Sequence, residues 1–195
     1  YLTGHPEDAE RVNKMIDRVR EYVLEVKNII GEGNAAWVFR DPEFPELCAK
    51  VIKQASIGGL GSNTLSQEAS YMDDIYDLEV EGVRSPLPYA IINDPGLQII
   101  IMECLPAVSV GDLVKGIASL PRPEEVDVEK FASGVARYFK KMHERDLIHF
   151  DPHEGNVMID FDTHTARVID FGKTKRIQGF GDEEARVEQY KKSDM

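Results

Sequence analysis

The sequence has no apolar run long enough to cross a bilayer. Its longest nearly apolar stretch, residues 97–105, is interrupted by Gln98 and Glu103, whereas a transmembrane helix needs about 20 apolar residues. Basic residues are also few, because 23 lysines and arginines stand against 35 acidic residues and leave a net charge of -12. Nucleic-acid binding requires a basic face for the phosphates. We therefore expect neither a membrane nor a nucleic acid as a partner.

Cysteine is scarce as well, and Cys48 and Cys104 each lie in an apolar, strand-like run. Two buried free thiols are more common in such positions than a disulfide, and they suit a reducing, cytosolic environment. The rest of the composition, with 42% hydrophobic residues, is typical of a globular protein. A chain of 195 residues suffices for one domain or two small lobes, and we expect a monomer.

The first half of the chain, up to about residue 103, shows the patterns of a small sheet with one or two helices. Apolar residues at helical spacing predict one helix and a second helical face, and turn-like residues join the last two strands as a hairpin. The predicted helices are 6–23 and 63–79, and the predicted strands are 24–30, one at the end of the segment 31–39, 46–53, 89–92 and 97–104.

The second half opens with helical patterns, at 109–120 and 126–146. The longer helix carries one apolar stripe, made of Val128, Phe131, Val135, Phe139 and Met142. A polar loop follows, and then a short hairpin of 156–160 with 166–170. A charged helix is predicted at 182–192, and we expect it to be the end of the domain.

Three features of the first half suggest chemistry. Gly31 and Gly33 lie between two strands, where backbone N–H groups can approach a phosphate without side-chain obstruction, although such a pattern is more often a plain turn. Lys50 lies in the middle of the third strand, where an inward lysine would need a partner. Since Lys50 and Lys53 have opposite parity on the strand, only one of them faces inward. Glu68, on the apolar side of the following helix, is an available acid unless it is simply solvated.

The polar loop reads H-x-D-x-x-x-x-N, with Asp151 and Asn156 five residues apart. Asp170 follows fourteen residues after Asn156, and the intervening hairpin would bring it back beside the loop. Asp151 can then accept the proton of an incoming hydroxyl. Asn156 and Asp170 offer hard oxygen ligands to Mg²⁺ (or Mn²⁺), which bridges nucleotide phosphates. Such a metal also makes an acid-rich site compatible with ATP.

Taken in order, these motifs resemble those of the protein kinase superfamily over about residues 24–175. The resemblance implies an α+β, two-lobed kinase-like fold that makes 1–195 a single minimal domain. Within it, a small antiparallel-sheet N-lobe with the N-terminal helix would occupy 1–104. A reduced, mostly helical C-lobe would occupy 105–195.

The resemblance also implies roles for individual residues. Met102 would be the gatekeeper, and the backbone from Glu103 to Leu105 would bind adenine. The catalytic residues that it implies are Lys50, Glu68, Asp151, Asn156 and Asp170, of which Asn156 and Asp170 hold the metal. The nucleotide-binding residues that it implies are Gly31, Gly33, Val38, Lys50, Met102, Glu103, Leu105 and His153.

Several residues depart from the pattern of the family. Ala36 replaces the third glycine of the glycine-rich loop and still leaves the first two free to approach phosphate. Phe150 stands where many regulated kinases have arginine, so control by activation-loop phosphorylation is not expected. His153 stands where serine/threonine kinases usually have lysine, and it either touches the γ-phosphate or makes a structural hydrogen bond. Only 23 residues follow Gly172, without an A-P-E motif.

This reduced form is similar to the minimal effector kinases that bacteria inject into host cells. The similarity implies an ATP- and Mg²⁺-dependent protein kinase that phosphorylates Ser or Thr of a host protein, such as a chaperone (HSP90) or a ubiquitin-related complex. It also implies a cytosolic environment, reached by secretion from a bacterium; any export signal would precede Tyr1. Two alternatives remain open: a small-molecule phosphotransferase for aminoglycoside- or choline-like substrates, and a pseudokinase that only binds partners.

Overall fold

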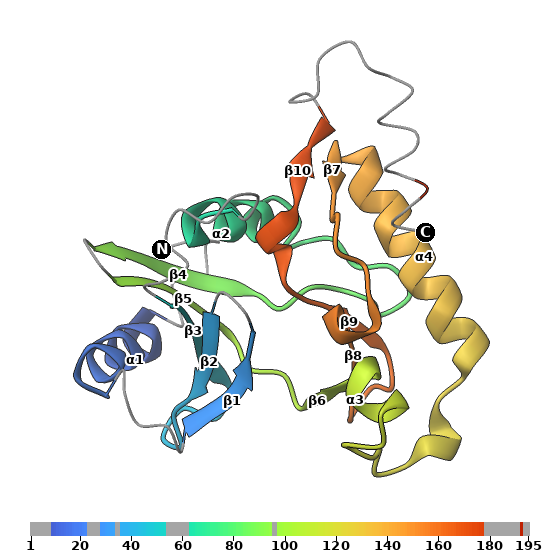
Figure 1. Cartoon of the computed structure of the whole chain (residues 1–195), viewed down its shortest axis with the longest axis horizontal. Coiled ribbons are helices and arrows are strands. Elements are labelled where there is room, and N and C mark those ends of the chain that lie inside the picture. Colours follow the sequence, from blue (N-terminus) through green and yellow to red (C-terminus); the bar gives the residue numbers. More distant parts are fainter. Residues whose placement is uncertain are drawn as a thin grey trace. The chain divides into compact units, whose positions relative to one another are not determined.

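The computed structural model of the chain describes residues 9–22, 28–33, 36–53, 63–94, 97–177 and 192 (Figure 1). The chain divides into two compact units. The first unit is formed from Tyr1–Asp73 and Pro86–Leu105, and the second from Asp74–Ser85 and Pro106–Met195. Apart from residue 192, the charged helix predicted at 182–192 lies outside the described residues. The same holds for the first residues of the predicted helix 6–23 and of the predicted strand 24–30.

The first unit contains a five-stranded antiparallel sheet in the order β1-β2-β3-β5-β4. Its strands are β1 (Ile29–Glu32), β2 (Ala36–Arg40), β3 (Leu47–Ile52), β4 (Pro88–Asp94) and β5 (Leu97–Glu103). The predicted hairpin is present, because β4 pairs with β5 along its length. The prediction of a small antiparallel sheet in an α+β fold is therefore confirmed.

Helices cover both faces of this sheet. Helix α1 (Ala9–Tyr22) buries Val12, Met15 and Val19 in one apolar cluster with residues such as Ala49 and Ile101. Helix α2 (Leu65–Asp74) packs against Ile100 on the other face. Figure 1 shows α1 and α2 on opposite sides of the sheet. Helix α1 therefore covers one face of the sheet, and the alternation of strand side chains decides which residues meet which helix.

Ion pairs fix helix α1 to the connection between β2 and β3. Arg18 pairs with Asp41 and Glu43, and Arg11 pairs with Glu46 at 3.0 Å. The pairs with Glu43 and Glu46 are exposed and contribute little stability individually, whereas the Asp41 side chain is only 11% exposed. The buried methionine and valines of α1 therefore supply most of the attachment, and the ion pairs set its orientation.

The second unit is built around helix α4 (Val128–Glu144), with short strands beside it. A three-stranded sheet has the order β6-β8-β9, and β7 pairs with β10. These strands are β6 (Ala107–Ser109), β7 (Leu147–Ile148), β8 (Val157–Asp160), β9 (Ala166–Val168) and β10 (Lys175–Arg176). The predicted hairpin corresponds to β8 and β9, whereas β6, β7 and β10 are additions that the sequence pattern did not reveal. Among the described residues, no helix is both long and apolar enough to span a membrane.

Two predicted helices of the second unit need correction. The helix predicted at 109–120 is the single short α3 (Val110–Val114): Ser109 caps its start by accepting from the Asp112 N–H at 3.0 Å, and Gly116 follows with a positive φ of 68°. In α4 the apolar stripe does not include Val128, which is 71% exposed in the first turn. The stripe is buried further along, around Phe139 and Met142.

Candidate active site

The strand lysine and the helix acid of the first unit form a buried ion pair. Lys50 Nζ lies 2.6 Å from Glu68 Oε1, with 12% and 4% of the two side chains exposed. Val38 and Ile100 flank Lys50 in the sheet register, so all three share the α2 face. Lys53 instead lies 2.6 Å from Glu32. Of the two lysines, Lys50 is therefore the one that faces inward, and Lys53 faces away from α2.

Breaking this pair should leave the buried Glu68 carboxylate without its lysine. Lys50→Met is expected to lower the free energy of unfolding by about 1–3 kcal/mol, because Glu68 loses a charged hydrogen-bond partner. The double variant Lys50→Met with Glu68→Leu should recover most of that loss, since no charge then stays buried. Urea denaturation of the two variants and the wild type checks this. Equal stability of the single and double variants would show that Glu68 is solvated without Lys50.

The glycines predicted to approach phosphate lie at the free edge of the sheet. Gly31 pairs with Val38, and the Gly33 N–H donates to the Ala36 carbonyl at 2.9 Å. A Cβ built on Gly31 would meet Val38 at 3.6 Å, and one on Gly33 would meet the Ala36 carbonyl at 3.8 Å. Both distances are ordinary contacts, so packing within the described residues does not require glycine here. The approach of these two glycines to a phosphate therefore stays a prediction.

The segment predicted to contact adenine has a defined set of available backbone groups. The Glu103 N–H donates to the Leu87 carbonyl at 2.9 Å, and the Cys104 N–H donates to the Glu46 carbonyl at 2.7 Å. The Glu103 carbonyl accepts a weak bond from the Cys48 thiol at 3.5 Å. In the described part of the chain, the N–H of Leu105 donates no hydrogen bond. Within the described residues, the Leu105 N–H is therefore available as a donor to a base.

The two cysteines are free and buried, as predicted. A hydrogen bond with the Cys104 thiol, together with burial, raises the pKa of Cys48. Cys48 therefore stays a neutral thiol that packs in the sheet. The prediction of two structural thiols in place of a disulfide is confirmed.

His149 holds the polar loop of the second unit in place. Its ring is fully buried between Phe139 and Phe171, with ring centroids 5.6 Å and 5.1 Å away. Nδ1 accepts from the Asp151 N–H at 3.3 Å, so Nε2 carries the proton and donates to the Ile169 carbonyl at 3.0 Å. The ring thus ties Asp151 to the residue before Asp170. The sequence motif does not predict this role of His149; the apolar residues around it in sequence were the available signal.

Asn156 connects the same two segments by a second route. Its side-chain N–H donates to the Asp151 carbonyl at 3.0 Å and to Asp151 Oδ2 at 3.4 Å. Its own carbonyl accepts from the Ile169 N–H at 2.9 Å. Asp170 follows in the left-handed region with φ of 61°, and its carboxylate accepts from the Gly172 N–H at 3.4 Å. The structure therefore brings together Asp151, Asn156 and Asp170, as the motif spacing predicts. A non-glycine residue with positive φ is strained, and such strain gathers at functional sites.

The donor set of Asn156 and Asp170 fits a hard divalent cation. In the described ranges, the amide oxygen of Asn156 accepts no hydrogen bond, and the Asp170 carboxylate is exposed. No group of three or more His, Cys, Asp or Glu side chains suited to a metal exists among these residues. One amide and one carboxylate oxygen match the few protein ligands that Mg²⁺ takes when phosphates and water supply the rest.

His153 caps the turn Glu154–Asn156. Its Nδ1 accepts from the Gly155 N–H at 3.0 Å, and its Nε2 lies 3.8 Å from Asp151 Oδ2. A Cβ on Gly155 would lie 2.8 Å from the imidazole, so this close approach requires glycine. Of the two roles considered for His153, the structure contains the structural hydrogen bond.

A buried ion pair locks the hairpin that carries Asn156. Arg167 Nη2 lies 3.1 Å from Asp160 Oδ2, with side chains only 5% and 7% exposed. Asp160 Oδ1 also accepts from the Thr163 N–H at 2.9 Å. Burial alone would raise the pKa of Asp160, but these hydrogen bonds and the charge of Arg167 outweigh it and lower the pKa below its ordinary value.

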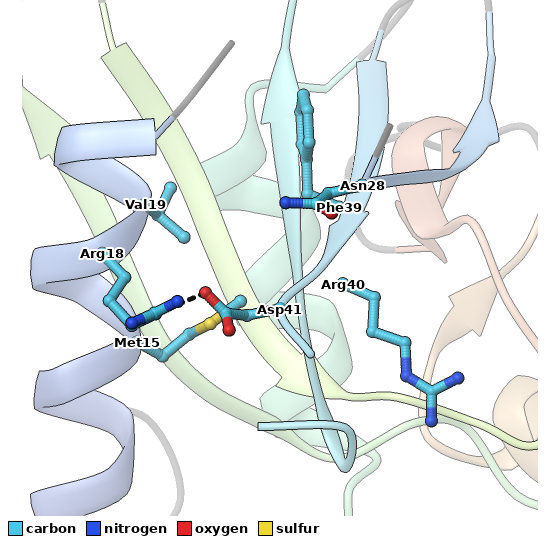
Figure 2. Close-up of a pocket in the computed structure, with 7 residues that line it drawn as sticks. All are labelled: Met15, Arg18, Val19, Asn28, Phe39, Arg40 and Asp41. Carbon is cyan, nitrogen blue, oxygen red and sulfur yellow. Dashed lines mark hydrogen bonds and ion pairs between the residues drawn. The ribbon is translucent and has the colours of Figure 1, made fainter. Parts of the chain in front are cut away.

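A hollow lies beneath α1, and none of the predicted site residues lines it (Figure 2). Its lining residues are Met15, Arg18, Val19, Asn28, Phe39, Arg40 and Asp41. Phe39 and Met15 belong to the apolar cluster on the α1 face of the sheet, whereas Lys50 faces α2. Figure 2 shows the Arg18 guanidinium directed at the Asp41 carboxylate. This hollow is a gap between helix and sheet, and it lies on the wrong face to serve Lys50.

Comparison with known proteins agrees with this arrangement. The protein kinase domain family matches residues 24–190, which is most of the chain. The chain belongs to the protein kinase family. It is also 30% identical over 79 residues to the mitogen-activated protein kinase kinase kinase MST11 of Pyricularia oryzae. That alignment covers 40% of this chain and 8% of the relative.

Proposed function

We propose that the protein is an ATP- and Mg²⁺-dependent kinase that transfers the γ-phosphoryl group to a serine or threonine hydroxyl of a protein. The observation that carries the proposal is the hydrogen-bonded set of Asp151, Asn156 and Ile169, which places Asp170 beside the loop. A scaffold that only bound partners would have no need for a carboxylate, an amide oxygen and a second carboxylate in this arrangement. The 79-residue similarity to a fungal kinase supports a protein acceptor.

In this reaction Asp151 orients the acceptor hydroxyl and takes up its proton. A bond forms between the hydroxyl oxygen and the γ-phosphorus, the bond from that phosphorus to the β–γ bridging oxygen breaks, and ADP leaves. Lys50, held by Glu68, binds nucleotide phosphates, and the Leu105 N–H and Glu103 carbonyl bind the base. A divalent cation on Asn156 and Asp170 would neutralise charge on the phosphate oxygens when bound.

We extend the proposal to a host protein as the acceptor, because Phe150 before Asp151 makes this loop similar to the H-aromatic-D loop of the minimal effector kinases. A cytosolic site of action follows from that branch. A chaperone or a ubiquitin-related complex is then the partner class to examine first.

The test is incubation with radiolabelled ATP and Mg²⁺, in buffer and in a eukaryotic cell lysate, beside Asp170→Asn. Protein label that requires wild-type enzyme and is lost with the variant would support a protein kinase and deliver its substrate. Consumption of ATP only when aminoglycosides or choline are added would replace the proposal with small-molecule transfer. Absence of nucleotide binding in a thermal-shift titration would instead indicate a pseudokinase.

A further inference from the structure

The carboxylate of the candidate base Asp151 is paired with a lysine that the sequence motifs do not predict. Lys173 Nζ lies 2.9 Å from Asp151 Oδ1, and 53% of the lysine side chain is exposed. Lys173 follows directly after Asp170-Phe171-Gly172. In the part of the chain that the structure describes, Lys173 is the one lysine or arginine paired with Asp151.

The other neighbours of the Asp151 carboxylate do not supply a full charge. Oδ2 receives a long hydrogen bond from the neutral Asn156 amide, at 3.4 Å. His153 Nε2 is further away, at 3.8 Å. Because His153 accepts at Nδ1 from Gly155, the ring in this arrangement carries its proton on Nε2 and is uncharged. The positive charge beside Asp151 therefore comes from Lys173.

The backbone of Lys173 is fixed, whereas its ammonium group is accessible. Phe171 and Thr174 on either side are fully buried, and the Thr174 N–H donates to the Phe171 carbonyl at 3.1 Å. The chain then continues into β10, where Lys175 pairs with Ile148. An exposed lysine–carboxylate pair contributes little to folding. Stability therefore does not explain why a lysine stands at position 173. Because its backbone is fixed and its side chain is flexible, the ammonium group can move between nearby anions.

The proton transfer to Asp151 brings the transferred phosphoryl group, which is an anion, within reach of the Lys173 ammonium group. A hydroxyl whose proton passes to Asp151 must have its oxygen within roughly 3 Å of the carboxylate. The phosphorus that this oxygen attacks lies one covalent bond beyond it, so the transferred group passes close to Lys173 Nζ. Cations that contact a phosphoryl group as it is transferred are among the largest contributors to such reactions.

We propose that Lys173 is a catalytic residue that pairs with Asp151 at rest and contacts the γ-phosphoryl group during its transfer. The inference rests on the kinase function proposed above. In the step, the hydroxyl proton passes to Asp151 while the phosphorus exchanges its bond to the bridging oxygen for one to the hydroxyl oxygen. Lys173 then interacts with the negative oxygens of the moving group and keeps its own protons throughout.

The test compares Lys173→Met and Lys173→Arg with Arg176→Met. Arg176 is a matched control, because it is an exposed cation three residues further along whose partner is Asp74, outside the site. Lys173→Met should lower kcat by about tenfold to a hundredfold and change the KM for ATP little. Lys173→Arg should recover part of the loss, and Arg176→Met should retain the wild-type kcat. Unfolding midpoints of all variants should agree within about 2 °C.

A second readout does not need turnover. Fluoroaluminate beside ADP imitates the planar phosphoryl group, so wild type should bind ADP more tightly when it is present. Lys173→Met should lose that gain and keep the affinity for ADP alone.

The outcomes separate the two hypotheses. An active wild type with an equally active Lys173→Met would overturn the role of Lys173 and leave the kinase function standing. A faster Lys173→Met would also overturn it, and would make the pair with Asp151 inhibitory. A wild type that neither transfers phosphate nor gains affinity from fluoroaluminate would overturn both.

Discussion

Asp151→Asn is expected to lower the kcat of phosphoryl transfer by about 10²- to 10⁴-fold. Asparagine has nearly the same size and still offers an oxygen to the Asn156 amide, which donates to Asp151 at 3.4 Å. Its neutral amide cannot take up the proton of the acceptor hydroxyl. The backbone contacts of residue 151 with His149 and Asn156 do not depend on the side-chain charge. The loss should therefore appear in kcat, while the affinity for nucleotide is kept.

Initial rates with radiolabelled ATP, together with calorimetric titration of the nucleotide, check this prediction. Glu154→Gln is the matched control, because Glu154 is an exposed acid in the same loop and its neutralisation should leave the rate unchanged. Full activity in Asp151→Asn would remove Asp151 from the role of base. An equal loss in Glu154→Gln would mean that the charge of the loop matters more than this one carboxylate.

Asp160→Ala is expected to lower the free energy of unfolding by about 3–5 kcal/mol. The substitution leaves the Arg167 guanidinium buried, where only 5% of its side chain is exposed, without its carboxylate partner. It also removes the acceptor for the backbone N–H groups of Asp162 and Thr163. Since Asp160 ends the strand that begins beside Asn156, activity should fall with stability. Urea denaturation, monitored by circular dichroism, measures the loss.

The difference in stability between wild type and Asp160→Ala should depend on pH in a definite direction. The pKa of Asp160 is lowered in the folded protein, so its contribution is complete above the ordinary value of about 3.9 and is lost as pH falls through the folded-state pKa. The difference in stability between wild type and Asp160→Ala should therefore be constant near neutral pH and narrow below about pH 4. The neighbouring Asp162→Ala, at an exposed position, should change stability by about 0.5 kcal/mol or less. If the difference between wild type and Asp160→Ala stayed constant down to the acid transition, the pKa of Asp160 would not be lowered in the folded protein.

The sequence predicts the paired and ordered parts of the site because simple periodicity governs them. Parity along the strand predicts that Lys50 and Lys53 face opposite sides, and helical spacing places Glu68 on the buried side of α2. The spacing of Asp151, Asn156 and Asp170 requires only that a hairpin closes between the last two. Since β8 and β9 pair in antiparallel register, this condition is met.

Other features depend on contacts that no local pattern encodes. Strands β7 and β10 contain two residues each, too few to show an alternation. Val128 fits the helical stripe of α4 but lies in the first turn, where it is 71% exposed. The pairing of Lys173 with Asp151 joins residues 22 positions apart. Its position depends on the buried Phe171 beside it, so the contact could be recognised only in three dimensions.

The attachment of α1 has a practical consequence for where the folding unit begins. The family match starts at residue 24, but Val12, Met15 and Val19 are buried in the same cluster as the central strands of the sheet. A fragment cut at the start of the match would expose that apolar surface to water and expose it to self-association. For recombinant work, the smallest autonomous piece therefore has to include residues 9–22, although they lie upstream of the family boundary.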